Sequence, residues 1–205
     1  MPDDAFVRIG HCSPDAPNVD VRLDGETVIE DVPFRTIGDY QQVPAGSHEV
    51  HVLPTGSEES VIETSIDVDA GEQYTALATG TVADENLKLT VLTDEVGEVP
   101  SGKAHVRFIH CSPDAPRVTV RVADDGPTLF ENVRFRRGTD YTPVDAGTYD
   151  IEVLPSGSDE VALSLSGIEF EGATAYSAIA VGLVSEGTLG AELIEDSRMM
   201  LEADD

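Results

Sequence analysis

The chain has 205 residues, and its 40 Asp and Glu against 12 Lys and Arg give a formal net charge of −28 at pH 7. This balance excludes nucleic-acid binding through phosphate contacts, because such contacts need clusters of basic residues. Acidic residues alternate with valine and other apolar residues along the chain, which excludes a disordered acidic protein and indicates a folded one.

Two interpretations of the acidic surface remain open. Carboxylates spread over both halves are typical of a protein from a halophilic cell that accumulates molar salt, where a Debye length of about 3 Å screens their repulsion. The alternative is an acidic surface that binds cations or a basic partner. No stretch of the sequence concentrates the charge, which favours the salt-adapted interpretation.

The sequence begins MPDD and has neither the positive nor the apolar region of a secretory signal. No apolar run approaches the roughly 20 residues that span a bilayer. We therefore expect a cytoplasmic protein without membrane insertion; removal of a leader would instead place it at the cell surface. Cys12 and Cys111 are expected to be free thiols, since a disulfide framework usually places a pair within each domain.

Apolar and polar residues alternate with a period of two, which predicts β-strands throughout. Asp24-Gly25 predicts a hairpin turn, and Gly- and Pro-containing turns separate the later strands. About seven short strands in about 100 residues, with no helical pattern, predict an antiparallel β-sandwich. In the first half, the predicted strands are residues 6–11, 18–23, 27–29, 40–43, 48–53, 61–68, 74–80 and 87–92.

The second half of the chain repeats the first. The segment HCSPDAP at residues 11–17 returns letter for letter at residues 110–116. A period of about 100 residues is the size of a domain and exceeds the 20–50 residues of a solenoid unit. We therefore predict two tandem domains. The predicted parts are a first β-sandwich at 1–93, a linker at 94–102, a second β-sandwich at 103–194, and an acidic tail at 195–205 that forms a helical turn around Met199 or frays.

The repeated pattern resembles a known family. Its elements are V-R two residues before H-C-S-P-D-A-P, then a D-Y pair, then a strand that opens with A-G and ends with V-L-P. Together they resemble the domain-of-unknown-function 4397 family, and the resemblance covers nearly the whole chain as two copies. It implies immunoglobulin-like β-sandwiches, often in tandem and often on envelope-associated proteins of bacteria and archaea. It implies no established activity and no catalytic residues.

The repeated segment offers an imidazole, a thiol, a hydroxyl and a carboxylate within five residues. Adjacent strand residues point to opposite faces, and zinc prefers paired ligands at spacings such as C-x₂-C, so a single metal site is disfavoured. The same orientation disfavours a cysteine nucleophile activated by the neighbouring histidine. We expect no catalytic residue and no cofactor. The candidate metal ligands are His11, Cys12, Asp15, His110, Cys111 and Asp114.

A structural turn is the favoured interpretation of this segment. Pro14 fixes φ near −65°, and Asp15 is expected to hydrogen-bond its own turn. His11 is expected to hydrogen-bond a carbonyl group of the loop. The repeated D-Y pair predicts buried rings of Tyr40 and Tyr141, with hydroxyl groups bonded to a neighbouring loop as in a tyrosine corner.

Arg134, Arg136 and Arg137 form the only basic run, and they are the predicted interaction residues. They meet either an acidic surface of another copy or carboxylates of their own domain. Sheet edges with few lysines and prolines make pairing between edges feasible. We expect a non-catalytic structural or interaction protein that binds a protein partner or forms a homo-oligomer. The alternatives are a small-molecule or metal-binding module at the repeated loops and, less favoured, a redox protein using its cysteines.

Overall fold

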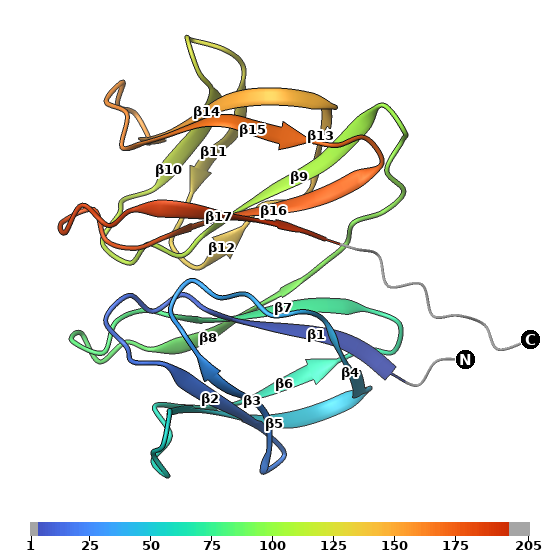
Figure 1. Cartoon of the computed structure of the whole chain (residues 1–205), viewed down its shortest axis with the longest axis vertical. Coiled ribbons are helices and arrows are strands. Elements are labelled where there is room, and N and C mark those ends of the chain that lie inside the picture. Colours follow the sequence, from blue (N-terminus) through green and yellow to red (C-terminus); the bar gives the residue numbers. More distant parts are fainter. Residues whose placement is uncertain (1–3, 197–205) are drawn as a thin grey trace, which may run out of the picture. The chain divides into compact units, whose positions relative to one another are not determined.

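The computed structural model describes residues 4–196, which contain strands and turns and no helix. No helix in this range could therefore cross a membrane. The chain divides into two compact units between Glu95 and Val96, which we call the first and the second domain. Each is a β-sandwich (Figure 1).

Two four-stranded sheets form the first domain. The sheet we call the β1 sheet has the order β4-β1-β7-β8, and the β2 sheet has the order β3-β2-β5-β6. All neighbours are antiparallel except β1 and β7, which are parallel. The strands are β1 (Asp4–His11), β2 (Val19–Leu23), β3 (Glu26–Val32), β4 (Gln41–Pro44), β5 (Gly46–Pro54), β6 (Ile62–Val68), β7 (Gln73–Thr79) and β8 (Lys88–Thr93).

The second domain repeats this topology. Its β9 sheet has the order β12-β9-β16-β17, with β13 also paired to β9, and its β10 sheet has the order β11-β10-β14-β15. The pair β9 and β16 is parallel, like β1 and β7. The strands are β9 (Lys103–His110), β10 (Val118–Val122), β11 (Thr128–Val133), β12 (Arg137–Gly138), β13 (Thr142–Asp145), β14 (Gly147–Pro155), β15 (Leu163–Phe170), β16 (Thr174–Val181) and β17 (Gly190–Glu195).

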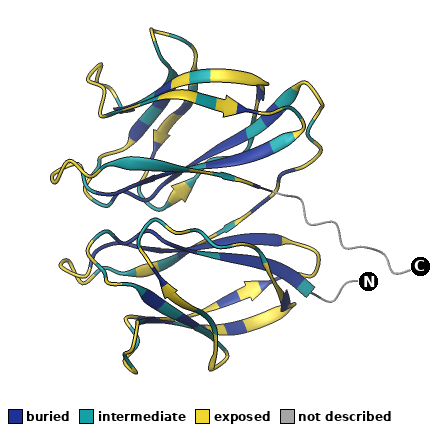
Figure 2. Ribbon diagram, viewed as in Figure 1, coloured by how far each residue is buried: buried dark blue, intermediate teal, exposed yellow. Residues whose placement is uncertain are grey.

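Each core lies between the two sheets of its own domain. Alternate residues of a strand face inward, so Val7 of β1 and Val21 of β2 meet across the first sandwich, as Val106 and Val120 do in the second. Figure 2 shows the buried stretches along the paired strands. Full burial of one such valine contributes about 1.5–3 kcal/mol, and this repeated contribution holds the sheets together.

The predicted all-β fold, with two tandem β-sandwiches, is confirmed. Two chain segments belong to the domains more closely than the sequence indicated. The predicted boundaries place Asp94 in the linker and Asp196 in the tail, but both are buried and hydrogen-bonded within their own domain. Their burial is decided by distant partners, which local composition does not show. The rest of the predicted tail, from residue 197, lies outside the described residues.

Candidate functional site

The repeated turn, residues 11–17 and 110–116, is held by its histidine. His11 ends β1, and its Nε2–H donates to the carbonyl oxygen of Pro17 at 2.9 Å. The Ser13 N–H donates to His11 Nδ1 at 3.3 Å, which fixes the neutral tautomer with the proton on Nε2. Burial lowers the pKa of His11 and outweighs the opposing effect of the Pro17 carbonyl. The predicted bond from the histidine to a loop carbonyl is confirmed.

The second domain reproduces this histidine geometry atom for atom. His110 Nε2 lies 2.9 Å from the Pro116 oxygen, and its Nδ1 accepts the Ser112 N–H at 3.3 Å. The pKa of His110 is also lowered, first by burial. Phe135 packs edge-on against the ring at 6.2 Å between centroids. Each imidazole is therefore neutral, and both of its nitrogen atoms are engaged by the turn itself.

The aspartate of the turn bonds a distant loop and not only its own turn. Asp15 Oδ1 and Oδ2 accept the N–H groups of Val82 and Ala83 at 2.8 and 2.9 Å, in the connection between β7 and β8. Asp15 does contact its own turn, since the Ser13 hydroxyl lies 3.4 Å from its Oδ1. The prediction of a bond within the turn is incomplete, because it does not include the two bonds to the distant loop. These carboxylate bonds join the β1–β2 connection to the β7–β8 connection.

Asp114 makes the equivalent bonds to Val184 and Ser185, both at 2.8 Å. Burial acts to raise the pKa of Asp114, but the N–H groups of Ser185 and Val184 outweigh it and hold the pKa below its usual value. The carboxylate is therefore ionised at neutral pH. Both of its oxygen atoms already accept backbone hydrogen bonds.

The two cysteines are buried and form no disulfide. Cys12 N–H donates to the Ala78 oxygen and Cys111 N–H to the Ala180 oxygen, each at 2.8 Å, which extends the parallel pairing beyond β1 and β9. The adjacent histidine is occupied by backbone groups and is not placed to act as a base for the thiol.

Within residues 4–196, no three His, Cys, Asp or Glu side chains converge on a point where a metal ion could bind. The structure therefore brings the candidate ligands of each repeat together as one turn, and not as a ligand set. Ser112 adds a further internal bond, from its hydroxyl group to the Gly182 oxygen at 2.7 Å. The chemical groups of the turn join two loops at one end of each sandwich.

A second polar group in each domain was largely missed by sequence reasoning. In the first domain, Arg8 Nε donates to Thr75 Oγ1 at 2.8 Å, and Thr75 Oγ1 donates to Asp94 Oδ2 at 2.6 Å. Tyr40 OH donates to the same Asp94 oxygen at 2.6 Å, and the Arg8 guanidinium lies 4.7 Å from the centre of the Tyr40 ring. We call these four residues the Arg–Asp cluster of the first domain.

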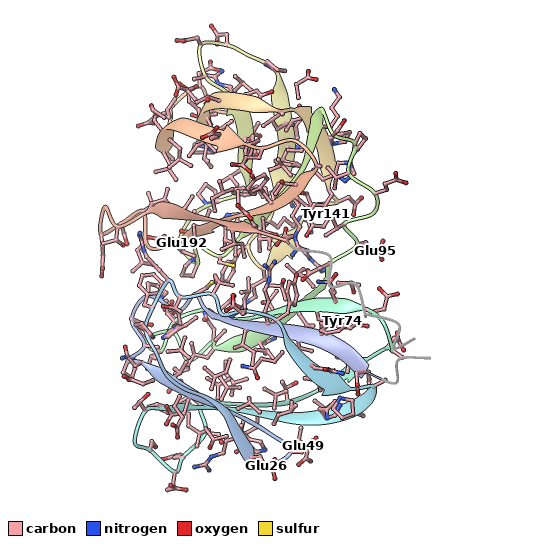
Figure 3. The ribbon with its side chains drawn as sticks, turned by 45° about the vertical axis from the view of Figure 1, so that its right-hand side comes forward. Glu26, Glu49, Tyr74, Glu95, Tyr141 and Glu192 are labelled. Carbon is pink, nitrogen blue, oxygen red and sulfur yellow. The ribbon has the colours of Figure 1, made fainter. Side chains whose placement is uncertain are left out.

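The second domain builds the same cluster from Arg107, Tyr141, Ser177 and Asp196. Arg107 Nε to Ser177 Oγ and Ser177 Oγ to Asp196 Oδ2 are each 2.6 Å, and Tyr141 OH to Asp196 Oδ2 is 2.7 Å. Figure 3 labels Tyr141 in this domain. The predicted bond from a tyrosine hydroxyl to a neighbouring loop is confirmed, but each ring is half-buried and not buried. The matched Arg8 and Arg107 were the available signal; nothing in the sequence pointed to the aspartates.

His48 is a candidate without a counterpart in the second repeat. Its Nδ1 lies 2.6 Å from Asp24 Oδ2 and its Nε2 lies 2.7 Å from the Pro44 oxygen. Both neighbours only accept hydrogen bonds, so this site favours the protonated imidazole, in which both ring nitrogens donate. The bond to Asp24 is the main cause that raises the pKa of His48. At the same place in the second domain, Tyr149 OH donates to the Asp145 oxygen at 2.8 Å.

The basic run follows β11 directly and ends at Arg137, the first residue of β12. Arg136 is half-buried, and its guanidinium lies 4.7 Å from the centre of the Phe135 ring. Arg134 and Arg137 are exposed, and neither forms an ion pair with any residue from 4 to 196. In this run Arg136 therefore stacks on Phe135, while Arg134 and Arg137 face solvent.

Comparison with known proteins agrees with the duplication. Residues 5–121 and 119–205 match the sequence profile described as "Domain of unknown function (DUF4397)". The chain belongs to the DUF4397 family. No curated protein matches this DUF4397 protein.

A solved structure similar to this DUF4397 protein is the "Crystal structure of CBMbc (family CBM26) from Eubacterium rectale Amy13K in Complex with Maltoheptaose". The two sequences are 7% identical, and the match covers 95% of this chain and 97% of that chain. The TM-score is 0.28, and a score this low carries no argument about fold or ligand.

Proposed function

We propose that this DUF4397 protein is a non-catalytic interaction protein that assembles with further copies of itself. The observation that carries the proposal is the exposure of Arg134 and Arg137, without ion pairs among the described residues, on a chain whose net charge is −28. Acidic side chains such as Glu26 and Glu49 are exposed on the first domain (Figure 3). A second copy therefore offers many carboxylates that these two guanidinium groups can bind.

The formation of such contacts between copies depends on the ionic strength. At low ionic strength, copies with this net charge repel each other, whereas at molar salt the Debye length of about 3 Å leaves only groups in direct contact to interact. An exposed Arg–carboxylate pair is worth about 0–1 kcal/mol. The two arginines can therefore orient the copies relative to each other, but they cannot hold the assembly together alone. A stable assembly also needs surface that is buried between the copies. We propose that the acidic surface is an adaptation to a high-salt cytoplasm, which keeps such contacts selective.

A non-catalytic role is supported by how the reactive groups are used. His11 and His110 are neutral and bonded at both ring nitrogens, and Asp15 and Asp114 accept backbone N–H groups at both oxygens. A small-molecule or metal site at these loops would have to break those bonds first. For the sandwiches, we propose immunoglobulin-like domains, which is supported by two facing, mostly antiparallel sheets in each unit.

Light scattering after size exclusion, in molar KCl with reductant, tests the proposal. A discrete mass that is a multiple of 21.8 kDa supports self-assembly, and a mass of 21.8 kDa at all accessible concentrations overturns it. We expect Arg134→Glu and Arg137→Glu to lower the mass of the assembly. Arg117→Glu is the matched control, because Arg117 is also exposed in the second domain and lies outside the basic run. An equal effect of all three substitutions would show that only net charge matters.

A further inference from the structure

The edges of the sheets are not protected equally. An edge strand presents a row of backbone N–H and C=O groups to solvent, and proteins block such rows with bulges, prolines, short strands or charges. β3, β11 and β15 have register shifts against their neighbours, and the shift in β15 lies at Gly167, whose φ is +69°. β4 and β13 are short and contain Pro44 and Pro143. β6 carries carboxylates at Glu63 and Asp67.

Apart from Lys88 at its start, β8 has none of these devices. It pairs with β7 without interruption over six residues, from Lys88 opposite Thr79 to Thr93 opposite Tyr74. Its sequence KLTVLT contains no proline, no glycine and no carboxylate. In a chain where 40 of 205 residues are acidic, this strand carries one charge, and that charge is positive.

The equivalent edge strand of the second domain, β17, is protected against pairing by its charges. β17 has the sequence GAELIE, with a glycine at its start and two carboxylates. Val91 of β8 pairs with Ala76, and Leu193 of β17 pairs with Ala178, so the two side chains are equivalent. Their exposed fractions are 37% and 39%. The two strands therefore match in geometry and in apolar exposure, and differ in charge.

We propose that β8 is the edge through which two copies of this protein pair, strand to strand, about a two-fold axis. The inference rests on the self-assembly proposed above and names the surface that supplies its buried contact. Antiparallel pairing centred on Val91 places Val91 opposite Val91 of the second copy and Thr90 opposite Leu92, because a two-fold axis perpendicular to the sheet keeps each side chain on the same face. The β1 sheet then continues across both copies, and backbone hydrogen bonds add to side-chain contact.

Charge argues for a second copy as the occupant. In this pairing the two Lys88 residues lie six positions apart, about 20 Å at 3.4 Å per residue. This separation exceeds the Debye length of about 3 Å at molar salt, so the two cations do not oppose pairing. The same arrangement of two β17 strands, centred on Leu193, would place their Glu192 residues diagonally across the axis on the same face of the sheet, close enough to repel each other. The charges therefore allow two β8 strands to pair with each other, whereas they oppose pairing of two β17 strands.

Charge substitutions at matched positions test the pairing in the full chain. We expect Val91→Lys and Val91→Glu each to weaken the assembly in molar KCl by about tenfold or more in dissociation constant, because each places like charges side by side across the axis. Leu193→Lys and Leu193→Glu, at a position with almost the same exposure, should leave the mass of the assembly unchanged. Circular dichroism and urea unfolding confirm that each variant is folded.

Each other outcome has a distinct meaning. If the wild-type protein is a monomer, the proposed self-assembly itself is wrong. If it assembles and both Val91 variants assemble equally well, self-assembly stands and the β8 edge is wrong. If Val91→Lys strengthens and Val91→Glu weakens the assembly, the occupant is an acidic strand and not a second β8. Amide hydrogen exchange gives an independent readout, since exchange in residues 88–93 should slow as protein concentration rises, and unchanged rates would contradict the pairing.

Discussion

Replacement of His110 by alanine tests whether the repeated turn is structural. The side chain is 0% exposed, and it donates to the Pro116 oxygen while accepting the Ser112 N–H. The substitution removes the ring and leaves both backbone groups without their side-chain partner. A ligand-binding histidine would behave differently, because its loss would abolish binding and leave folding intact.

The structure gives the expected magnitude. Truncation of a buried aromatic ring to alanine costs about 3–5 kcal/mol, and the imidazole belongs at the lower end because it is smaller than phenyl. Loss of one partner from a buried hydrogen bond costs about 1–3 kcal/mol. Pro116 is an exposed residue, so its carbonyl group regains part of this free energy from water. We therefore expect the free energy of unfolding of the second domain to fall by about 3–5 kcal/mol.

Urea unfolding in molar KCl, followed by circular dichroism, measures this loss. His110→Gln retains an N–H donor near the position of Nε2 and should lose less stability than His110→Ala. His51→Ala is a control, because the His51 side chain is 33% exposed. His11→Ala should destabilise the first domain to a similar extent. A loss below about 1 kcal/mol for His110→Ala would refute the reasoning, since it would show that the ring supports neither packing nor the turn.

Two further predictions concern pH and backbone conformation. Because the pKa of His48 is raised by Asp24, its stabilising effect is complete below the unfolded pKa near 6.5 and is lost as pH rises through the folded pKa. The urea midpoint of the first domain should therefore fall over that range, and His48→Tyr, which installs the second-domain residue, should abolish this part of the pH dependence; an unchanged profile would contradict the charged imidazole. Gly182→Ala should cost at least about 2 kcal/mol, because a Cβ there would lie 2.2 Å from the Thr188 oxygen at a φ of +93°. Gly187→Ala, with φ of +66° and open space, should cost only about 1 kcal/mol, and equal losses would show that the clash plays no part.

The sequence contains enough to predict the strands and the turn, because both follow from local chemistry. The period of two places Val7 and Val21 in the core, and Pro14, three residues after His11, marks the turn. The same strand pattern and turn residues recur about 100 positions later, so they do not coincide by chance. The bond from His11 to a loop carbonyl could be predicted because donor and acceptor are six residues apart.

The charge, the duplication, the strand periodicity and the chemistry of the turn were thus determined by the sequence alone. Tertiary structure decided which distant groups meet: Asp15 with the N–H groups of Val82 and Ala83, and Asp94 with Tyr40 and Thr75. These pairs are separated by 19 to 68 residues, so no local pattern links them. They form because the parallel pairing of β1 with β7 brings the ends of distant strands together, and a carboxylate placed there is stabilised only by the donors that the fold supplies.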